Sequence, residues 1–492
     1  MTPTLRRCLI PLACIAAVPA VAQQADTEAY RQQGLAELAR LKASVPIDRP
    51  ARNVIVFIGD GMGVSTLTAA RIHQGQLAGK DGESFVTAMD TLPHAALVKT
   101  YSHDAQVADS APTATAILAG VKTRNGSIGV GPEALTDDCA SARGHDVPSI
   151  FALAQQQGRA TGVISTARIT HATPAAAYAH TPQRDWEAAV PAAAKAAGCK
   201  DIASQLVEDS VGSKLDVVLG GGRRYFLPAT ATDPEYPEVK GLREDGRDLI
   251  AEWQRHNRGA RYVTDAAGFA ALNPARDHKV LGLFQPDHMQ YEADRKGDKA
   301  GEPSLADMTR TSIAMLSRNQ RGFVLLVEAG RIDHAHHAGN ARRALEDAVA
   351  LDQAVAAALE ATKGTDTLIV TTADHSHAFS FAGYPTRNNP ILGVAAGDDH
   401  QPFRARDGKG YTTLGYANGP GAVTGERADP IGTDTTALDY KQQALVPLGG
   451  ETHGGEDVAV RATGPMAHLF KGTIEQHGIY YVIADAMGAG EK

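Results

Sequence analysis

Short runs of consecutive apolar residues alternate along this chain with alanine-rich stretches of helical character. The apolar runs contain many β-branched residues, which is typical of strands buried on both faces of a parallel sheet. They cover residues 54–58, 161–164, 216–219, 323–327 and 367–370. The helical stretches between them include residues 147–157, 186–197 and 340–361. This alternation of strand and helix predicts a doubly wound α/β fold.

Two segments lie outside this pattern. In residues 26–42, Leu35, Leu38 and Leu41 have helical spacing, which predicts a short amphipathic helix able to pack on a second subunit. Residues 378–452 are rich in Gly, Pro, Asp and Asn and have little periodicity, so we expect an inserted loop region. At 492 residues, one domain with insertions competes with two domains.

Residues 1–22 have the three parts of a secretory signal peptide. Arg6 and Arg7 come first, an apolar run covers residues 8–18, and Ala20-Val21-Ala22 forms a small-x-small cleavage site. The alternative is a buried N-terminal helix. No later segment approaches the roughly 20 apolar residues of a membrane span. We therefore expect an exported protein, periplasmic or secreted, without a membrane span in its mature chain.

The net charge and the cysteine content indicate which binding partners and which cellular compartment to expect. The formal net charge is −8, and loss of Arg6 and Arg7 with the leader would make it more negative. Because no Lys/Arg-rich run is interleaved with aromatic residues, we expect no nucleic-acid partner. Cys139 and Cys199 are the cysteines of the mature chain, and an even pair in an exported protein predicts one disulfide. Two buried thiols are the alternative.

Unusual polar residues follow four of the predicted strands. Asp60, His171, Glu328 and the pair Asp374-His375 each come within a few residues of a strand end. In open α/β sheets, ligands bind at the carboxyl edge of the strands, where the loops diverge. The sequence therefore predicts a site at that edge.

Two of these segments offer the residue types of metal ligands. Asp333 and His337, in the stretch 328–337, stand at i and i+4, so a helix starting there would point both to one side. Asp374 and His375 are adjacent in a predicted loop and can both reach one ion. The alternatives are a solvated, histidine-rich helix start and an Asx-turn.

Further segments are compatible with cation and phosphate binding. Glycines flank Asp60 and let the backbone turn sharply, although many strand-to-helix turns share this form. Ser110 follows Asp109 at a predicted helix start, where the helix dipole favours phosphoryl oxygens; helix capping alone is the alternative. Arg184 can grip two phosphate oxygens, or be a surface residue. These residues occur together with His171 and with His453 near the end of the chain. Such a combination of carboxylate and histidine residues at separate strand ends is typical of a multi-metal phosphoryl-transfer centre.

The motifs and their order resemble those of alkaline phosphatases from about Arg52 to about Tyr481. The shared segments are Gly59-Asp60-Gly61-Met62-Gly63, Asp109-Ser110-Ala111, Gly120-Val121-Lys122-Thr123, Gly220-Gly221-Gly222-Arg223, Leu281-Gly282-Leu283-Phe284, residues 328–337, residues 374–377 and Thr452-His453-Gly454. The resemblance implies a three-layer α/β/α sandwich with a large, mostly parallel central sheet and a crown-like loop region. It also implies a catalytic domain over residues 51–492 after an N-terminal arm or helix over residues 23–50.

The resemblance also assigns ligands for two Zn²⁺ and one Mg²⁺ per subunit. One zinc would be held by Asp333, His337 and His453. The second zinc, beside Ser110, would be held by Asp60, Asp374 and His375. Magnesium would be held by Asp60, Thr173 and Glu328. Arg184 would clamp the substrate phosphate.

The reaction implied by the resemblance is hydrolysis of many phosphate monoesters through a phosphoserine at Ser110. Since no histidine or lysine adjoins Ser110 in the sequence to act as its base, metal coordination would lower its pKa instead. The zinc beside Ser110 would activate the nucleophile. The other zinc, held by Asp333, His337 and His453, would stabilise the leaving oxygen and then supply the hydroxide that hydrolyses the phosphoserine. A homodimer is typical of the family.

Four positions indicate a branch within the family. His171 and His334, beside the implied ligands, stand where the best-known enterobacterial enzymes have an aspartate and a lysine. The chain therefore resembles the animal and marine-bacterial pattern, in which magnesium is held less tightly. Cys139 and Cys199 stand where the animal enzymes have a disulfide.

Three other functions compete with this interpretation. A sulfatase would have arginine where the Ser110-Ala-Pro-Thr-Ala114 segment ends in alanine. A phosphodiesterase of the same superfamily would differ in loops that the sequence does not define. A non-catalytic metal- or phosphate-binding protein would have lost the nucleophile or a ligand, yet all of these residues are present.

Overall fold

The computed structural model describes residues 27–489, which fall into two compact units. The predicted signal peptide at residues 1–22 lies outside the described residues. Helix α1 (Thr27–Ala43) is the described part of the first unit, and Arg31–Glu28 and Arg40–Glu37 ion pairs lie along it. The second unit begins at Ser44 and contains every other described element.

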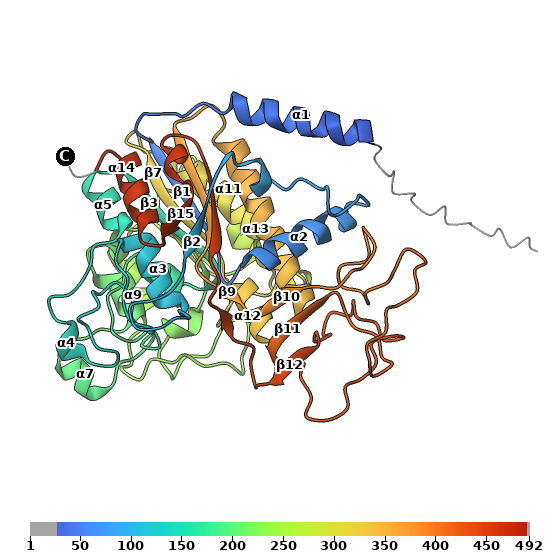
Figure 1. Cartoon of the computed structure of the whole chain (residues 1–492). Helices are drawn as coiled ribbons and strands as arrows, with labels where there is room; N and C mark the ends of the chain where they lie inside the picture. Colours follow the sequence, from blue (N-terminus) through green and yellow to red (C-terminus); the bar gives the residue numbers. More distant parts are fainter. Residues whose placement is uncertain (1–26, 490–492) are drawn as a thin grey trace, which may run out of the picture. The chain divides into compact units, whose positions relative to one another are not determined.

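A ten-stranded mixed sheet forms the centre of the second unit (Figure 1). Its strands, in spatial order, are β15 (Thr473–Glu475), β2 (His94–Lys99), β14 (Val458–Thr463), β8 (Thr367–Ala373), β1 (Asn53–Gly59), β7 (Phe323–Ala329), β3 (Ala160–Arg168), β4 (Val217–Gly221), β6 (Val280–Leu283) and β5 (Arg261–Val263). Only β14 runs antiparallel to its neighbours. The prediction of a large, mostly parallel sheet is therefore confirmed.

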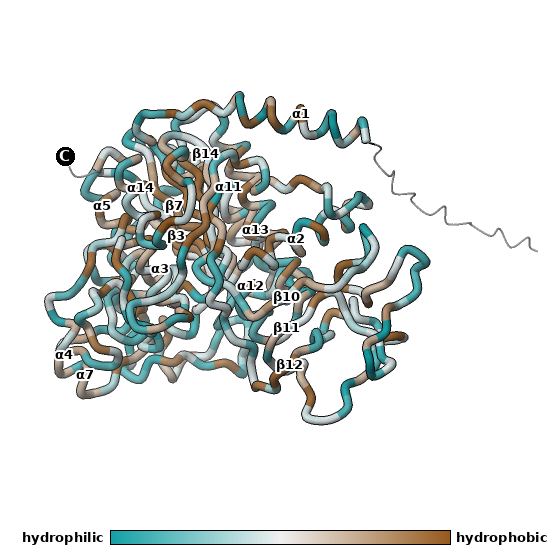
Figure 2. Tube along the Cα trace, in the orientation of Figure 1, coloured by the Kyte–Doolittle hydropathy of each residue, from teal (hydrophilic) through white to brown (hydrophobic). Residues whose placement is uncertain are grey.

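The five strands predicted from apolar runs are β1, β3, β4, β7 and β8. Every residue in them is buried except Arg168 at the end of β3. Figure 2 shows the hydrophobic trace along the central strands, with hydrophilic residues gathered in the loops. Burial on both faces explains why these strands lack the polar alternation of a half-exposed sheet.

Helices cover both faces of the sheet, which completes the three layers (Figure 1). One layer contains α2 (Val64–Leu77), α11 (Leu305–Leu316), α12 (Arg331–His337) and α13 (Ala341–Ala361). The other contains α3 (Ser110–Ala119), α5 (Ile150–Gln156), α6 (Ala172–Ala175) and α14 (Gly478–Ala486). The remaining α-helices are α4 (Cys139–Ala142), α7 (Ala192–Ala196), α8 (Ile202–Glu208), α9 (Leu249–His256) and α10 (Ala266–Ala270). None of the helices in residues 27–489 is both long and apolar enough to span a bilayer.

The predicted helix over residues 186–197 is wrong for most of its length. Only α7 is helical there, and it starts directly after Pro191. Proline has no N–H to donate and is favoured at a helix start, not in an interior. The preceding residues pair elsewhere: the carbonyl groups of Trp186 and Glu187 accept hydrogen bonds from Ile202 and Ala203. These tertiary bonds replace the helical ones.

Residues 378–452 contain a small sheet and long irregular connections. Its strands are β10 (Phe379–Phe381), β11 (Leu414–Gly419) and β12 (Ala444–Pro447). A separate two-stranded pairing joins β9 (Ser376–His377) to β13 (His453–Gly454), with His377 opposite His453. This pairing brings the two ends of the segment together at the edge of the main sheet.

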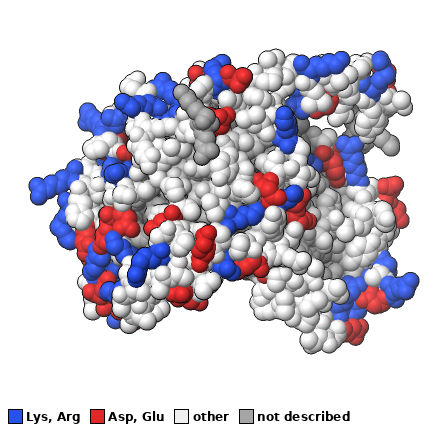
Figure 3. Space-filling view, turned by 60° about the vertical axis from the view of Figure 1, so that its left-hand side comes forward, with Lys and Arg blue, Asp and Glu red and all other residues white. Residues whose placement is uncertain are grey.

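Charged side chains of both signs are interspersed over the face drawn in Figure 3, with uncharged areas between them. Nucleic-acid-binding surfaces instead gather Lys and Arg into a stripe or patch. The visible face carries no such stripe.

Candidate metal centre

The register of the central strands brings three carboxylates to one edge of the sheet. The last residues of β1, β7 and β8 lie level with one another. Asp60 and Asp374 follow β1 and β8 directly, and Glu328 is the second-last residue of β7. All three side chains are fully buried. Parallel pairing thus places residues from distant parts of the sequence at one carboxyl edge, as in other open α/β sheets.

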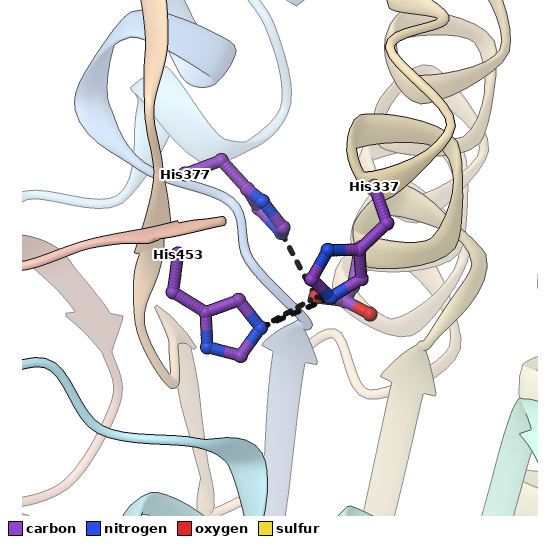
Figure 4. Close-up of side chains that lie close together, drawn as sticks. His337, His377 and His453 are labelled. Carbon is purple, nitrogen blue, oxygen red and sulfur yellow. Dashed lines mark hydrogen bonds and ion pairs between the residues drawn. The ribbon is translucent and has the colours of Figure 1, made fainter. Parts of the chain in front are cut away.

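Asp333, His337, His377 and His453 form what we call the histidine group, with one ligand atom from each lying within 4.8 Å of the others. Asp333 Oδ1 lies 2.8 Å from His377 Nε2 and 3.3 Å from Nε2 of both His337 and His453. Figure 4 shows the three rings converging from different elements: α12, β9 and β13. Imidazole nitrogens with a carboxylate oxygen are a donor set that Zn²⁺ prefers.

The second nitrogen of each ring is held from outside the histidine group. His337 Nδ1 lies 2.5 Å from the carbonyl oxygen of Glu451, and His453 Nδ1 lies 2.9 Å from that of Ala108. His377 Nδ1 contacts the Glu451 carboxylate at 2.5 Å. Donation from Nδ1 to these oxygens leaves Nε2 as the ligand atom and fixes each ring plane.

Asp60, Asp374 and His375 surround Ser110, and we call these four residues the Ser110 group. Ser110 Oγ lies 3.1 Å from His375 Nε2 and 3.3 Å from Asp60 Oδ1. His375 Nε2 is 3.3 Å from Asp60 Oδ1 and 3.4 Å from Asp374 Oδ2. Ser110 is the first residue of α3, so its hydroxyl lies at the positive end of the helix dipole.

Asp60 also belongs to a third cluster, with His171 and Glu328, and the Thr173 side chain lies against Glu328; we call these four residues the carboxylate group. Four of its atoms are buried and lack a hydrogen-bond partner among the described residues: Asp60 Oδ2, His171 Nδ1, Thr173 Oγ1 and Glu328 Oε1. Burying unpaired polar atoms is costly, and a bound cation would remove that cost. The donor set therefore fits an ion, and its oxygen-rich character fits Mg²⁺.

Burial and mutual repulsion shift the pKa values of these carboxyl groups. Burial raises the pKa of Asp60, and the charges of Asp374, Asp333 and Glu328 raise it further. Burial likewise raises the pKa of Glu328 to about 7. Burial acts in the same direction on Asp333, but hydrogen bonds from three histidines outweigh it and hold that pKa well below its usual range. Cations would offset the repulsion among these groups.

Arg184 lies beside the Ser110 group with its guanidinium held at two points. Nη1 donates to Asp109 Oδ1 at 3.1 Å, and Nη2 lies 3.0 Å from His171 Nε2. Asp109 in turn caps α3, since its carboxylate accepts from the Ala111 N–H. One carboxylate thus positions both the start of the helix and the arginine.

Comparisons with known proteins agree on one family. Residues 51–489 match the family model described as alkaline phosphatase. The tissue-nonspecific alkaline phosphatase isozyme of Gallus gallus is 47% identical over 480 residues, covering 95% of this chain and 91% of that protein. The alkaline phosphatase of Gadus morhua is 47% identical over 451 residues, covering 90% and 93%. The chain belongs to the alkaline phosphatase family. It is accordingly a hydrolase of phosphate monoesters.

Solved alkaline phosphatases share the fold. The enzyme from Thermus thermophilus superposes with a TM-score of 0.65 at 25% identity, covering 92% of this chain and 94% of that one. The enzyme from the Antarctic bacterium TAB5 superposes with a TM-score of 0.60 at 23% identity, covering 90% and 99%.

The structure of this alkaline phosphatase brings the predicted site residues to one sheet edge. The predicted ligand sets fall into the three groups, with Ser110 and Arg184 between them. His171 lies close enough to Asp60 and Glu328 to be a ligand itself. His334 lies outside the three groups: its ring centroid is 5.4 Å from that of His171, and its Nδ1 lies 3.2 Å from Arg331 Nη1.

Sequence reasoning missed two residues of the alkaline phosphatase centre. His377 lies in the predicted 374–377 segment, two residues after His375. Residues at i and i+2 of an extended segment lie on one face, and this spacing was the available signal. Glu451 has no such signal, because it follows two glycines in an irregular region. It meets His377 only because β9 and β13 pair.

The predicted disulfide is present in the alkaline phosphatase structure. Cys139 and Cys199 are bonded, with their Cα atoms 5.9 Å apart and a sequence separation of 60. The bond joins α4 to the segment that follows α7.

Proposed function

We propose that this alkaline phosphatase transfers the phosphoryl group of its substrate to Ser110 and then to water, with two Zn²⁺ and one Mg²⁺ bound at the sheet edge. The observation that carries the proposal is the place of Ser110 Oγ, 3.1 Å from His375 Nε2 and 3.3 Å from Asp60 Oδ1. A hydroxyl buried among carboxylate and imidazole ligands is suited to nucleophilic attack.

The donor sets support a different ion in each group. The histidine group and the Ser110 group combine imidazole and carboxylate donors, which suit Zn²⁺. The carboxylate group offers two carboxylates and the Thr173 hydroxyl, which suit Mg²⁺. When bound, the ions would supply Lewis acidity that lowers the pKa of the Ser110 hydroxyl and of water and offsets phosphoryl charge.

The chain's own residues orient the reaction. Arg184 binds two oxygens of the phosphoryl group through its planar guanidinium, which Asp109 keeps in place. Ser110 Oγ attacks phosphorus and loses its proton, the P–O ester bond breaks, and the departing oxygen gains one proton, so that the product leaves as the alcohol. Water then attacks the phosphoserine, which restores the Ser110 hydroxyl and releases inorganic phosphate. The positive end of α3 favours the charge gathered at Ser110 in both steps.

Trapping the phosphoenzyme tests this proposal. Acid quenching of the enzyme during turnover, followed by peptide mass spectrometry, is expected to show a phosphoryl group on Ser110. Ser110→Ala is expected to lose both this signal and the activity. Ser312→Ala is the matched control, because Ser312 is equally buried on α11 and outside the three groups. A fully active Ser110→Ala enzyme would refute the covalent mechanism.

Substrate preference separates monoesterase from diesterase action. We expect p-nitrophenyl phosphate to be hydrolysed much faster than its bis-ester, since Arg184 and the metal groups bind the free oxygens of a dianionic monoester. Equal rates on both esters would favour the diesterase alternative.

We also propose that this enzyme binds magnesium less tightly than the enterobacterial enzymes do. Within the carboxylate group, His171 is a neutral imidazole, because burial holds its pKa well below the usual range. A neutral ring contributes no charge toward Mg²⁺, whereas an aspartate there would. Activity that does not respond to added Mg²⁺ would count against this proposal.

Export and assembly are the last parts of the proposal. The leader-like residues 1–22 and the Cys139–Cys199 disulfide support an exported enzyme, because disulfides persist in oxidising compartments. We propose a homodimer to which α1 contributes contacts. Sedimentation of the mature enzyme with and without residues 23–43 tests the dimer, and N-terminal sequencing of the exported protein tests the cleavage site.

A further inference from the structure

Arg184 lies on a segment without regular structure that runs beside the metal centre. We call residues 182–187 the Arg184 strap. Its backbone is fixed near the middle, where the Arg184 N–H donates to the Gly126 carbonyl at 2.7 Å. Something other than a helix or strand must therefore hold the rest of the strap in place.

The two halves of the disulfide hold the strap from either side. On the Cys139 side, the Asp137 N–H donates to the Pro182 carbonyl at 3.2 Å, and the Asp137 carboxylate accepts from Gln183 Nε2 at 2.7 Å. Asp137 adopts a φ of 64°, an uncommon backbone for a residue other than glycine. That conformation belongs to the segment that the disulfide anchors.

On the Cys199 side, the start of α8 holds the other end of the strap. The Ile202 N–H donates to the Trp186 carbonyl at 2.9 Å, and the Ala203 N–H donates to the Glu187 carbonyl at 3.0 Å. The disulfide therefore joins two short segments that each bond to the strap.

The Trp186 side chain packs against the disulfide and not against the main core. Trp186 is buried, and with Cys139 and Ala194 it forms a small apolar cluster distinct from the large central one. Helices α4 and α7, which carry Cys139 and Ala194, lie side by side in Figure 1. A cluster this small provides little packing of its own, so the covalent bond largely determines its geometry.

Two cavities flank this cluster. One has a volume of about 300 Å³ and is lined by both cysteines, and the other has a volume of about 410 Å³ and is lined by Cys199 and Val190. Side chains outside this cluster hold the last residue of the strap, because the Glu187 carboxylate accepts hydrogen bonds from Arg168 and Thr170.

The middle of the strap carries the Arg184 guanidinium, which is the group that binds phosphate in the proposed function. Asp109 and His171 hold that guanidinium: Nη1 lies 3.1 Å from Asp109 Oδ1, and Nη2 lies 3.0 Å from His171 Nε2. A displacement of about 1 Å in a substrate-binding group can cost 10²-fold in rate, so a small shift at Trp186 would be felt at the phosphate.

We propose that Trp186, held by the Cys139–Cys199 disulfide, is a positioning residue that sets the place of Arg184 and hence the affinity for phosphate. This inference rests on the proposed function, in which Arg184 grips the phosphoryl oxygens. It assigns the disulfide a role in ligand binding in addition to any contribution to folding.

The test is a double-mutant cycle on zinc- and magnesium-loaded enzyme, with the Kd of inorganic phosphate measured by calorimetry. Trp186→Leu is expected to raise the Kd about 5- to 20-fold, with the bound zinc unchanged and KM altered more than kcat. Trp186→Phe, which keeps an aromatic ring on the disulfide, is expected to restore most of the affinity. In an Arg184→Ala background, Trp186→Leu is expected to change the Kd less than about twofold, because the two residues act through one interaction.

Trp253 provides the matched control, since it is buried on α9 within the main core. Trp253→Leu is expected to lower the melting temperature without changing phosphate affinity. The proposal is overturned if Trp186→Leu leaves the phosphate Kd unchanged, or if its effect is as large in the Arg184→Ala background. A wild-type enzyme that neither binds phosphate nor hydrolyses monoesters would instead refute the proposed function.

Reduction of the wild-type enzyme gives the same test without a substitution. A water-soluble phosphine reduces the disulfide to two thiols and becomes the phosphine oxide, with water supplying the oxygen and both thiol protons. Thiol titration follows the conversion. The reduced, metal-loaded enzyme is expected to show the same rise in phosphate Kd, reversed on reoxidation. Unchanged affinity in the fully reduced, folded enzyme would contradict the proposal.

Discussion

The histidine group and the carboxylate group lie on the same sheet edge but satisfy their polar atoms in opposite ways. In the histidine group, Asp333 Oδ1 lies 2.8 to 3.3 Å from the Nε2 atoms of its three histidines, and the Nε2 atoms of His337 and His453 lie 3.1 Å apart. In the carboxylate group, four buried atoms have no partner within the described part of the chain. The first group can persist as a hydrogen-bonded cluster, whereas the second depends on a cation.

The histidine group is also more exposed to solvent than the two carboxylates of the carboxylate group. The His337 side chain is 39% exposed and that of His453 is 14% exposed, while Asp60 and Glu328 are fully buried. An ion in the histidine group can therefore meet substrate and water directly. An ion in the carboxylate group would act mainly through Asp60, which both the Ser110 group and the carboxylate group share. The histidine group is therefore suited to direct contact with substrate and water, and the carboxylate group is suited to supporting the Ser110 group through Asp60.

Removal of all ions is expected to have the largest effect. Chelation followed by gel filtration should lower kcat/KM by more than about 10³-fold, because Lewis-acid stabilisation of the transferring group is lost. Zn²⁺ alone is expected to restore most of the activity, and Mg²⁺ the remainder. Recovery with Mg²⁺ alone would reverse the roles of the two groups.

Matched amide substitutions are expected to rank the two groups. Asp333→Asn removes a ligand charge from the histidine group and is expected to lower kcat/KM by about 10²-fold or more, with loss of one zinc per chain. Glu328→Gln makes the equivalent change in the carboxylate group and is expected to cost about tenfold, with the zinc retained. Activity assays paired with metal analysis measure both, and equal losses of zinc would contradict the ranking.

Glu451 tests whether residues outside the ligand sets hold the histidine group in place. Glu451→Gln weakens the contact that orients His377, and is expected to lower zinc affinity about 10-fold. Zinc transfer to a fluorescent chelator measures this affinity. Glu360→Gln on α13, outside every metal group, is the control and is expected to leave it unchanged. An unchanged affinity in Glu451→Gln would show that His377 needs no such support.

The smallest of the expected effects is the change in Mg²⁺ affinity with pH near neutrality. Burial raises the pKa of Glu328 to about 7, so in the ion-free protein this carboxyl is protonated below that pH and charged above it. Because Mg²⁺ binds the carboxylate, its affinity is expected to rise with pH through about 7 and to fall about tenfold per pH unit below about 6. Calorimetry at a series of pH values from 5 to 9 measures the Mg²⁺ affinity. A flat profile, or one rising toward acid, would exclude Glu328 as a ligand.

The sequence predicted the sheet and most of the site because both depend on short patterns. Apolar runs indicate fully buried strands, and the polar residues just beyond them mark the carboxyl edge. Asp60, Glu328 and Asp374 meet because the strands that carry them are neighbours in register. The resemblance to a known family supplied what spacing alone left open, such as the pairing of Asp333 with His453.

The failures of prediction arise from contacts between distant segments. Residues 186–191 are alanine- and apolar-rich like the helices, yet Pro191 and the bonds from Ile202 and Ala203 hold them in another conformation. Glu451 lies in a glycine-rich loop and enters the centre only through the pairing of β9 with β13. Neither the bonds nor the pairing leaves a local signature in the sequence.

Anomalous X-ray scattering from crystals of the metal-loaded enzyme tests the central claim most directly. Maps recorded on either side of the zinc absorption edge are expected to show two zinc peaks, one in the histidine group and one beside Ser110, and none in the carboxylate group. Density without a zinc signal is expected between Asp60, Thr173 and Glu328. A zinc peak there with none in the histidine group, or no ion beside Ser110, would contradict the account.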